Sequence, residues 1–264
     1  MLRMRVTRFH MLLTTTAVLA IAVFCLSAGT VRWVTLSALF TTCGLVTGLG
    51  VSFPEWRMFG PSLCRVHTTQ KVVALTFDDG PDPASTPVLL DLLARKGARA
   101  TFFCIGQRVA RHRELARRIA MEEHLVGNHS FAHSGGTNFF GEARLRADLE
   151  RAQNEITQTA GRAPEFFRPP MMLTNQRVFR VTRALSLTVA GCTVRGYDRR
   201  GASTQKVLRR VLRRLQPGVI IALHDGGVSA ERLVDLVERL LDQLHTQGYR
   251  CLRLDELVAC EKTV

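Results

Sequence analysis

Two adjacent carboxylates follow the first strongly apolar stretch beyond the N-terminal region. Residues 71–77 (KVVALTF) are apolar and rich in β-branched types, which predicts a buried strand, and Gly80-Pro81 ends it. Asp78 and Asp79 then lie at the carboxyl end of a strand, the edge at which barrels and open α/β sheets build their active sites. Ordinary turn chemistry is the alternative, with Asp79 bonded to its own backbone and Asp78 in solvent.

Two histidines supply the partners that such a carboxylate would need to hold a metal. His129 and His133 in HSFAH are four residues apart, so both imidazoles can face one point from a helical turn or a tight loop. Two imidazoles and the Asp79 carboxylate make a three-ligand site with one open position, as in catalytic zinc centres. Asp78 would then stand beside the activated water and accept its proton. Taken alone, the histidine pair is equally compatible with two surface neighbours.

Three later polar residues follow apolar runs in the same way. Arg168 follows PEFF and could hold Asp78 ionised and correctly aimed. His224 follows IIAL and could donate a proton to a leaving group, while Asp198 in VRGYD could hold its ring and favour the imidazolium. A structural ion pair for Arg168 and a strand-end histidine for His224 are the alternatives. The spread of these groups over several strand ends favours a catalytic site.

The elements that must position these residues alternate between short apolar runs and amphipathic helical stretches. Strands are predicted at 71–77, 98–106, 164–170, 187–194 and 218–225, a short strand and loop at 125–133, and a final strand and turn at 249–258. Helices are predicted at 85–97, 109–123, 142–161, 178–186, 204–216 and 229–248. Such β/α alternation predicts a parallel sheet, open or closed into a barrel, in a single catalytic domain.

Five motifs in this order resemble the polysaccharide deacetylase family, also called the NodB-homology or carbohydrate esterase family 4 domain. They are TFDDGP (76–81), HSFAH (129–133), RPP (168–170), the strand-end Asp198 and ALHDG (222–226), within a match over roughly residues 71–257. The resemblance implies a distorted (β/α)7 barrel. It also implies hydrolysis of the N-acetyl group of amino sugars with a divalent metal, commonly Zn²⁺.

The resemblance implies roles for nine residues of this chain. Asp78 would be the base and His224 the acid, with Arg168 orienting the first and Asp198 the second. The metal ligands would be Asp79, His129 and His133. Leu223 would line the pocket for the acetyl methyl group, and the backbone N–H of Met171 would help to bind the oxyanion.

Two departures from the family pattern concern the substrate. Met171 and Met172 stand where the family often has an aromatic residue and a glycine, and RGYDR replaces the usual DxxDW. Trp56 is the domain's only tryptophan, so it has few aromatic walls for sugar stacking. The arginines of the altered motif favour an anionic group, such as a phosphate, over a neutral polymer; they are Arg195, Arg199 and Arg200.

The N-terminal region has the composition of a membrane anchor. Residues 1–53 contain no Asp or Glu, and all 22 acidic residues follow them. Two apolar segments, 11–29 and 34–53, are each about long enough to cross a bilayer, and Gly44 and Gly48 have the GxxxG spacing of closely packed membrane helices. We predict a membrane-anchoring helical hairpin at 1–53, a linker at 54–70 and the catalytic domain at 71–264. A signal peptide is the alternative for the first segment.

Charge and cysteine content bear on location and partners. More basic residues flank the outer ends of the two segments than the loop between them, which favours a cytoplasmic catalytic domain. If the second segment does not span, the domain is extracytoplasmic. Seven cysteines without paired spacing favour buried thiols and a reducing compartment.

The net charge of +14 invites a nucleic-acid interpretation, but no motif for nucleic acid is present. The basic face of VLRRVLRRLQ (207–216) would suit an anionic lipid surface, or would simply be solvated. We therefore expect membrane lipid, and no nucleic acid, as a partner.

The sequence thus predicts a membrane-anchored, metal-dependent deacetylase of a lipid-linked or otherwise anionic amino sugar. A cell-wall polymer is the competing substrate within the same class. A non-catalytic membrane receptor or scaffold that retains the metal site is the competing function. That function would not need paired groups for proton transfer.

Overall fold

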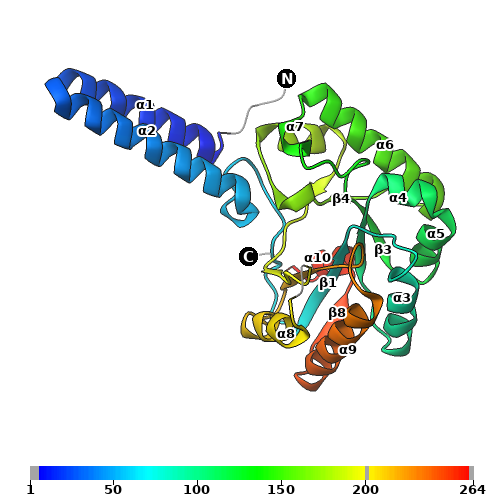
Figure 1. Ribbon diagram of the computed structural model, residues 1–264. Coiled ribbons are helices and arrows are strands. Elements are labelled where there is room, and N and C mark those ends of the chain that lie inside the picture. The colour runs from blue at the N-terminus through cyan, green and yellow to red at the C-terminus, as the bar shows by residue number, and fades with distance from the viewer. Residues whose placement is uncertain (1–5, 200–201, 262–264) are drawn as a thin grey trace.

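The chain folds around a curled parallel sheet covered by helices, as a computed structural model shows for residues 6–199 and 202–261 (Figure 1). The strand order is β5-β4-β3-β2-β1-β7-β6, with β8 also pairing with β1. All seven strand pairings are parallel. The predicted distorted (β/α)7 barrel is confirmed. The strands are β1 (Val72–Asp78), β2 (Thr101–Cys104), β3 (Leu125–Asn128), β4 (Phe166–Phe167), β5 (Thr188–Val189), β6 (Val194–Arg195), β7 (Ile220–His224) and β8 (Arg250–Leu252).

Helices pack around this sheet, most of them on its outer face and the last one against its inner face. They are α3 (Thr86–Arg95), α4 (Gly106–Arg111), α5 (Arg113–Met121), α6 (Glu142–Ala160), α7 (Gln176–Ala184), α8 (Thr204–Arg213), α9 (Ala230–Thr246) and α10 (Leu254–Ala259), with 3₁₀ turns at Pro54–Trp56, Thr137–Phe139 and Pro170–Met172. The strand β1 is buried on both sides. Val73, Leu75 and Phe77 join the core beneath α3 and α9, whereas Val72 and Ala74 point into the barrel. This explains the continuous apolar run of β1, since parallel strands covered on both faces need no polar alternation.

The parallel register brings the carboxyl ends of the strands to one edge. Asp78 at the end of β1 pairs with His224 at the end of β7, and Asn128 at the end of β3 pairs with Phe167 in β4. Chemistry-bearing residues that are distant in sequence therefore share this edge, which we call the catalytic edge.

Two predicted elements are divided in the structure. The strand predicted at 187–194 is two strands, β5 and β6, and the helix predicted at 109–123 is interrupted at His112, where φ is −127° and ψ is 51°. The break in the strand has a tertiary cause. The backbone carbonyls of Ala190 and Gly191 accept hydrogen bonds from the Arg168 side chain instead of continuing a ladder.

Two N-terminal helices, α1 (Arg8–Leu26) and α2 (Gly29–Ser52), form an antiparallel hairpin that projects from the domain (Figure 1). They have 19 and 24 residues, and by length and composition both could cross a membrane. A signal sequence would pass the same test. The hairpin returns to the domain at both ends: the Phe9 N–H donates to the Met58 carbonyl at 3.0 Å, and the Thr174 N–H donates to the Val51 carbonyl at 3.0 Å.

The residues between the hairpin and β1 lie against the sheet. Leu63 forms a parallel bridge with Ala190, and Arg65 forms an antiparallel bridge with Val219. Gly50 is needed where the hairpin meets this segment, because a Cβ there would lie 2.7 Å from the Met58 side chain.

Candidate active site and metal centre

Asp79 lies at the centre of a cluster formed with the two histidines of HSFAH. Its Oδ1 atom is 3.3 Å from Nε2 of His129 and 3.0 Å from Nε2 of His133. Asp79 and His129 are buried and His133 is partly exposed, and their ligand atoms all lie within 4.8 Å of one another. The sequence-predicted ligands are therefore brought together on the catalytic edge.

Local backbone geometry directs these three side chains to one point. Asp79 and His133 have left-handed backbones, with φ of 74° and 47°. Helix α6 holds the HSFAH loop, because the Asp148 carboxylate accepts from the Phe131 N–H at 2.9 Å and the Ala132 N–H at 3.2 Å. The buried Asn128 amide accepts from the Ser130 N–H at 2.8 Å. The histidine pair thus sits on a clamped loop and not on a helix.

The donor set fits a divalent cation. Nδ1 of His129 lies 2.7 Å from the Arg168 carbonyl, so in the neutral ring the proton is on Nδ1 and the lone pair of Nε2 faces Asp79. Oδ1 of Asp79 is buried and receives no hydrogen bond of normal geometry among the described residues. Two acceptors facing each other in a buried site call for a cation between them.

The electrostatics of Asp79 favour its ionised form. Burial alone would raise its pKa, but the adjacent His129 and His133 outweigh burial and hold the pKa well below its ordinary value. Its outer oxygen, Oδ2, accepts from Nη1 of Arg199 at 2.6 Å. Arg199 is one of the arginines that the sequence placed near the mouth, and its side chain is 45% exposed.

Asp78 is paired with Arg168 beneath the metal cluster. Nη1 of Arg168 donates to Oδ1 of Asp78 at 2.7 Å and also to Oγ1 of Thr76 at 2.7 Å. The Arg168 side chain is fully buried, and its guanidinium stacks over the Phe103 ring at 4.0 Å from the centroid. With Ala190 and Gly191 also accepting its protons, the position of this cation is fixed from several sides.

His224 and Asp198 form the second predicted pair. Nδ1 of His224 is 2.8 Å from Oδ1 of Asp198, and the His224 N–H donates to Oδ2 of the same carboxylate at 2.9 Å. Burial would lower the pKa of His224, but the hydrogen bond with Asp198 and the nearby Asp78 and Asp79 raise it above its ordinary value. The ring is therefore biased towards the imidazolium, the form that can donate a proton.

The remaining predicted residues are placed as follows. Leu223 is fully buried in β7, and its side chain lies against Gly196, where a Cβ would be 2.5 Å from its Cδ2. Met171 lies in a tight turn with φ of 55°, and its side chain is 53% exposed. Arg195 donates to the Ser52 carbonyl at 2.9 Å and so ties β6 to the hairpin. Arg200 lies outside the described residues.

Sequence reasoning missed Asp225, which follows His224 directly. It is fully buried, its Oδ2 accepts from Oγ1 of Thr86 at 2.6 Å, and burial raises its pKa to about 7. A Cβ on Gly80 would lie 2.1 Å from this carboxyl group, and one on Gly226 would lie 2.3 Å from the Asp79 carbonyl oxygen. The two Asp-Gly turns are thus interlocked. In the sequence, Asp-Gly follows a predicted strand at both 79–80 and 225–226, and this repeated pattern could have identified Asp225.

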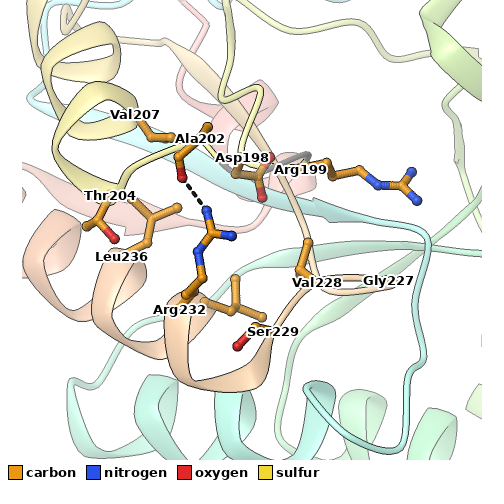
Figure 2. Close-up of a pocket in the computed structure, with 11 residues that line it drawn as sticks. Asp198, Arg199, Ala202, Thr204, Val207, Gly227, Val228, Ser229, Arg232 and Leu236 are labelled. Atoms are coloured by element: carbon orange, nitrogen blue, oxygen red, sulfur yellow. Dashed lines mark hydrogen bonds between the residues drawn. The ribbon is translucent and has the colours of Figure 1, made fainter.

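A cavity of about 110 Å³ lies between α8 and α9, with Asp198 on its wall (Figure 2). Arg232 projects into it and donates to the Ala202 carbonyl, whereas the Arg199 side chain points away from it (Figure 2). The cavity therefore borders Asp198 and is separate from the proposed metal ligands Asp79, His129 and His133.

Comparisons with known proteins match this geometry. Residues 65–190 match the family model described as polysaccharide deacetylase. A peptidoglycan-N-acetylglucosamine deacetylase of Bacillus cereus is 33% identical over 195 residues, which cover 73% of this chain and 91% of that protein. The solved structure of a peptidoglycan N-acetylglucosamine deacetylase, Bc1960, aligns with a TM-score of 0.71 at 30% identity, covering 76% of this chain and 94% of that one.

A second similar structure is a pseudoenzyme of the carbohydrate esterase 4 family from Bacillus anthracis. It aligns with a TM-score of 0.71 at 23% identity, covering 77% of this chain and 70% of that one. Similarity at this level shows the fold alone, so the fold by itself does not decide whether a chain is catalytic.

Proposed function

The chain belongs to the polysaccharide deacetylase family, and on this basis we propose that it is a metal-dependent hydrolase that removes N-acetyl groups from amino sugars. One observation carries the proposal: the cluster of Asp79, His129 and His133 shares the catalytic edge with a buried candidate base, Asp78 paired with Arg168, and a candidate acid, His224 paired with Asp198. A scaffold or receptor would need the cluster alone. The non-catalytic alternative therefore does not account for the pairs of Asp78 with Arg168 and of His224 with Asp198.

Each residue has a role that follows from its contacts. Asp79, His129 and His133 would hold the divalent cation, and a set of two imidazoles and one carboxylate favours Zn²⁺. Bound there, the cation would polarise the acetamide carbonyl and make water more acidic. Asp78 accepts the proton of the attacking water, and the hydrogen bond from Arg168 holds that carboxylate in place.

The acid side completes the reaction. His224, held as the imidazolium by Asp198, donates its proton to the departing amine, so that acetate and a free amino sugar leave. The Met171 N–H is proposed as a donor to the tetrahedral oxyanion, and Leu223 as part of the wall of the acetyl pocket.

For the substrate, we propose an N-acetylated amino sugar of a glycan or a lipid-linked saccharide presented at a membrane. The named relatives act on peptidoglycan, and this supports a cell-wall glycan. The exposed Arg199 beside Asp79 and the two apolar helices support an anionic sugar near a bilayer.

We propose that residues 1–53 anchor the protein and that 71–264 form the catalytic domain. The hydrogen bonds from both ends of the hairpin to the domain support an anchor that is retained over a signal sequence that is removed. The basic residues at the outer ends favour the cytoplasmic face. A reporter fused to the C-terminus tests this, because an exported C-terminus would favour peptidoglycan as the substrate.

Acetate release tests the proposed activity. The detergent-solubilised chain is incubated with N-acetylated glycans and polyprenyl-linked sugars, before and after chelation and after the return of Zn²⁺. We expect acetate from at least one amino sugar, loss on chelation and recovery with metal. Metal binding without acetate release from any substrate would favour the scaffold.

A further inference from the structure

Several exposed apolar side chains lie at the base of the hairpin and on nearby segments of the catalytic domain. Within 53–199 and 202–261, the large apolar side chains that are exposed are Phe53, Trp56, Val88, Met121, Phe139, Met171 and Tyr197. Single exposed apolar residues are normal, but contiguous groups mark interaction surfaces. All but Val88 and Met121 lie beside contacts with the hairpin. We call the group of Phe53, Trp56, Phe139, Met171 and Tyr197 the collar.

The first two collar residues follow directly from α2. Phe53 is the residue after the helix, and its ring stacks on Trp56 with centroids 6.1 Å apart. The Trp56 carbonyl accepts from Nη1 of Arg8, at the start of α1, at 2.7 Å. The two aromatic rings therefore lie at the base of the hairpin, where a spanning helix pair leaves the bilayer core.

The other three collar residues are linked to the hairpin directly or through one further contact. Met171 precedes Thr174, which donates to Val51 in α2, and Tyr197 follows Arg195, which donates to Ser52. Phe139 follows Asn138, whose carbonyl accepts from the Asn175 side chain at 2.7 Å, next to Thr174. The segments of Met171 and Tyr197 are thus bonded to the end of α2, and that of Phe139 is joined to it through Asn175.

The chemistry of the collar suits a lipid interface. Aromatic side chains with a polar group concentrate at the level of the headgroups, where an apolar body and a polar tip are both satisfied. Arg8 and Arg57 are exposed at the same place and outnumber the nearby Glu55, so anionic headgroups would be attracted. Continuity with two helices that are long and apolar enough to span a membrane identifies the occupant as the bilayer.

We propose that the collar rests in the interface of the lipid bilayer, so that the mouth of the site opens along the membrane surface. Met171 lies three residues after Arg168, and Tyr197 immediately precedes Asp198, so these two collar residues lie on the segments that carry the partners of the base Asp78 and the acid His224. The substrate class that fits is an amino sugar carried on a membrane lipid. This last step rests on the proposed function, whereas the contact with lipid does not.

Tryptophan fluorescence tests the contact with lipid. The chain has two tryptophans, Trp33 in α2 and Trp56 in the collar, so Trp33→Phe leaves Trp56 as the only reporter. The full-length variant is placed in discs of phosphatidylcholine and phosphatidylglycerol with brominated acyl chains. We expect bromine near the headgroup end to quench Trp56 more than bromine near the methyl end.

The matched control is Trp56→Phe, which reports Trp33 within the hairpin. Quenching of Trp33 without quenching of Trp56 would mean that the hairpin inserts while the collar stays in water. Quenching of neither would place the hairpin itself outside the bilayer. Either result overturns the proposal, and neither depends on activity.

Turnover tests the substrate class. The double variant Trp56→Ser with Phe139→Ser alters two exposed side chains outside the proposed catalytic groups. We compare N-acetylglucosamine on a lipid in the discs with a water-soluble N-acetylglucosamine oligomer. We expect about a tenfold loss of rate on the lipid form only, because the interfacial contact that presents it is weakened. The assignment is overturned if the unaltered chain hydrolyses both forms at equal rates, or if the double variant loses the same fraction of its rate on both. If the unaltered chain hydrolyses neither form, the proposed function fails, while Trp56 quenching still decides the collar.

Discussion

The floor and the rim of the candidate site are held by different kinds of interaction. The floor comprises Asp78, Asp79, His129, His133 and Arg168, and the rim comprises Met171, Arg195, Tyr197 and Arg199. The floor is fixed by the ends of the strands and by the fully buried Arg168 side chain, whose guanidinium donates to several acceptors. In the rim, Met171, Tyr197 and Arg199 are exposed, whereas Arg195 at the end of β6 is half-buried and is tied to the hairpin.

This difference separates what is general from what is particular to this chain. The match to the family model covers residues 65–190, which include the whole floor but end before Arg195 and Arg199. On the proposed function, the floor supplies the chemistry and the rim selects the substrate. Substitutions should therefore affect turnover strongly at the floor and selectively at the rim.

The largest effect is expected for Asp78→Asn. The amide has the shape of the carboxylate but cannot accept the proton of the attacking water, so turnover should fall by roughly 10³-fold. Metal content, measured by elemental analysis of the purified variant, should be unchanged because Asp79, His129 and His133 remain. Asp82→Asn, on the same loop but paired with Arg108, is the matched control. Substantial residual turnover in metal-loaded Asp78→Asn would remove the base from the scheme.

Arg168→Met should cost stability as well as activity. It removes one member of a buried ion pair and leaves Asp78 and several carbonyls without their donor, which costs about 3–5 kcal/mol of unfolding free energy. Denaturant titration measures this loss. The control is Arg180→Met, whose partner Glu142 is solvated, and it should change stability by less than about 1 kcal/mol. Similar losses for both variants would show that burial of the Arg168 ion pair adds nothing to stability.

Asp198→Asn should move the alkaline limit of activity to lower pH. Asp198 helps to raise the pKa of His224, so its neutral replacement lowers that pKa. The acid must be protonated to release the amine, and activity is lost as pH rises through its pKa, so the lower pKa gives an earlier loss. The pH dependence of kcat/KM for the two forms measures the shift. An unchanged alkaline limb would show that another group donates the proton.

The sequence predicts the floor because each of its residues stands directly after a predicted strand or in a short motif. Asp78, Arg168 and His224 follow apolar runs, and the parallel sheet then brings them to one edge. The rim depends on contacts that no local pattern contains. Arg195 was expected at the mouth, yet it bonds Ser52 of α2, more than a hundred residues away in the chain. The division of 187–194 into β5 and β6 likewise depends on the distant Arg168 side chain.

The smallest effect is expected for Arg199→Gln, although Arg199 contacts a proposed metal ligand directly. The ion pair with Asp79 joins a buried carboxylate to an arginine whose side chain is 45% exposed. An ion pair with such a solvated partner contributes at most about 1 kcal/mol to the unfolding free energy. Asp79 is also placed by its own backbone and by two imidazoles. Metal content should therefore be retained, and turnover of a neutral soluble amino sugar should change by less than about fivefold.

A selective rim also predicts how Arg199→Gln acts on a charged substrate. Turnover of an amino sugar that bears a phosphate should fall more than turnover of the neutral sugar, because one guanidinium donor is lost at the mouth. Arg195→Gln, which loses a bond to the hairpin and not to Asp79, is the matched variant. If Arg199→Gln instead lost metal and turnover as severely as a substitution in the floor, Arg199 would be part of the metal centre, and the boundary between floor and rim would lie beyond it.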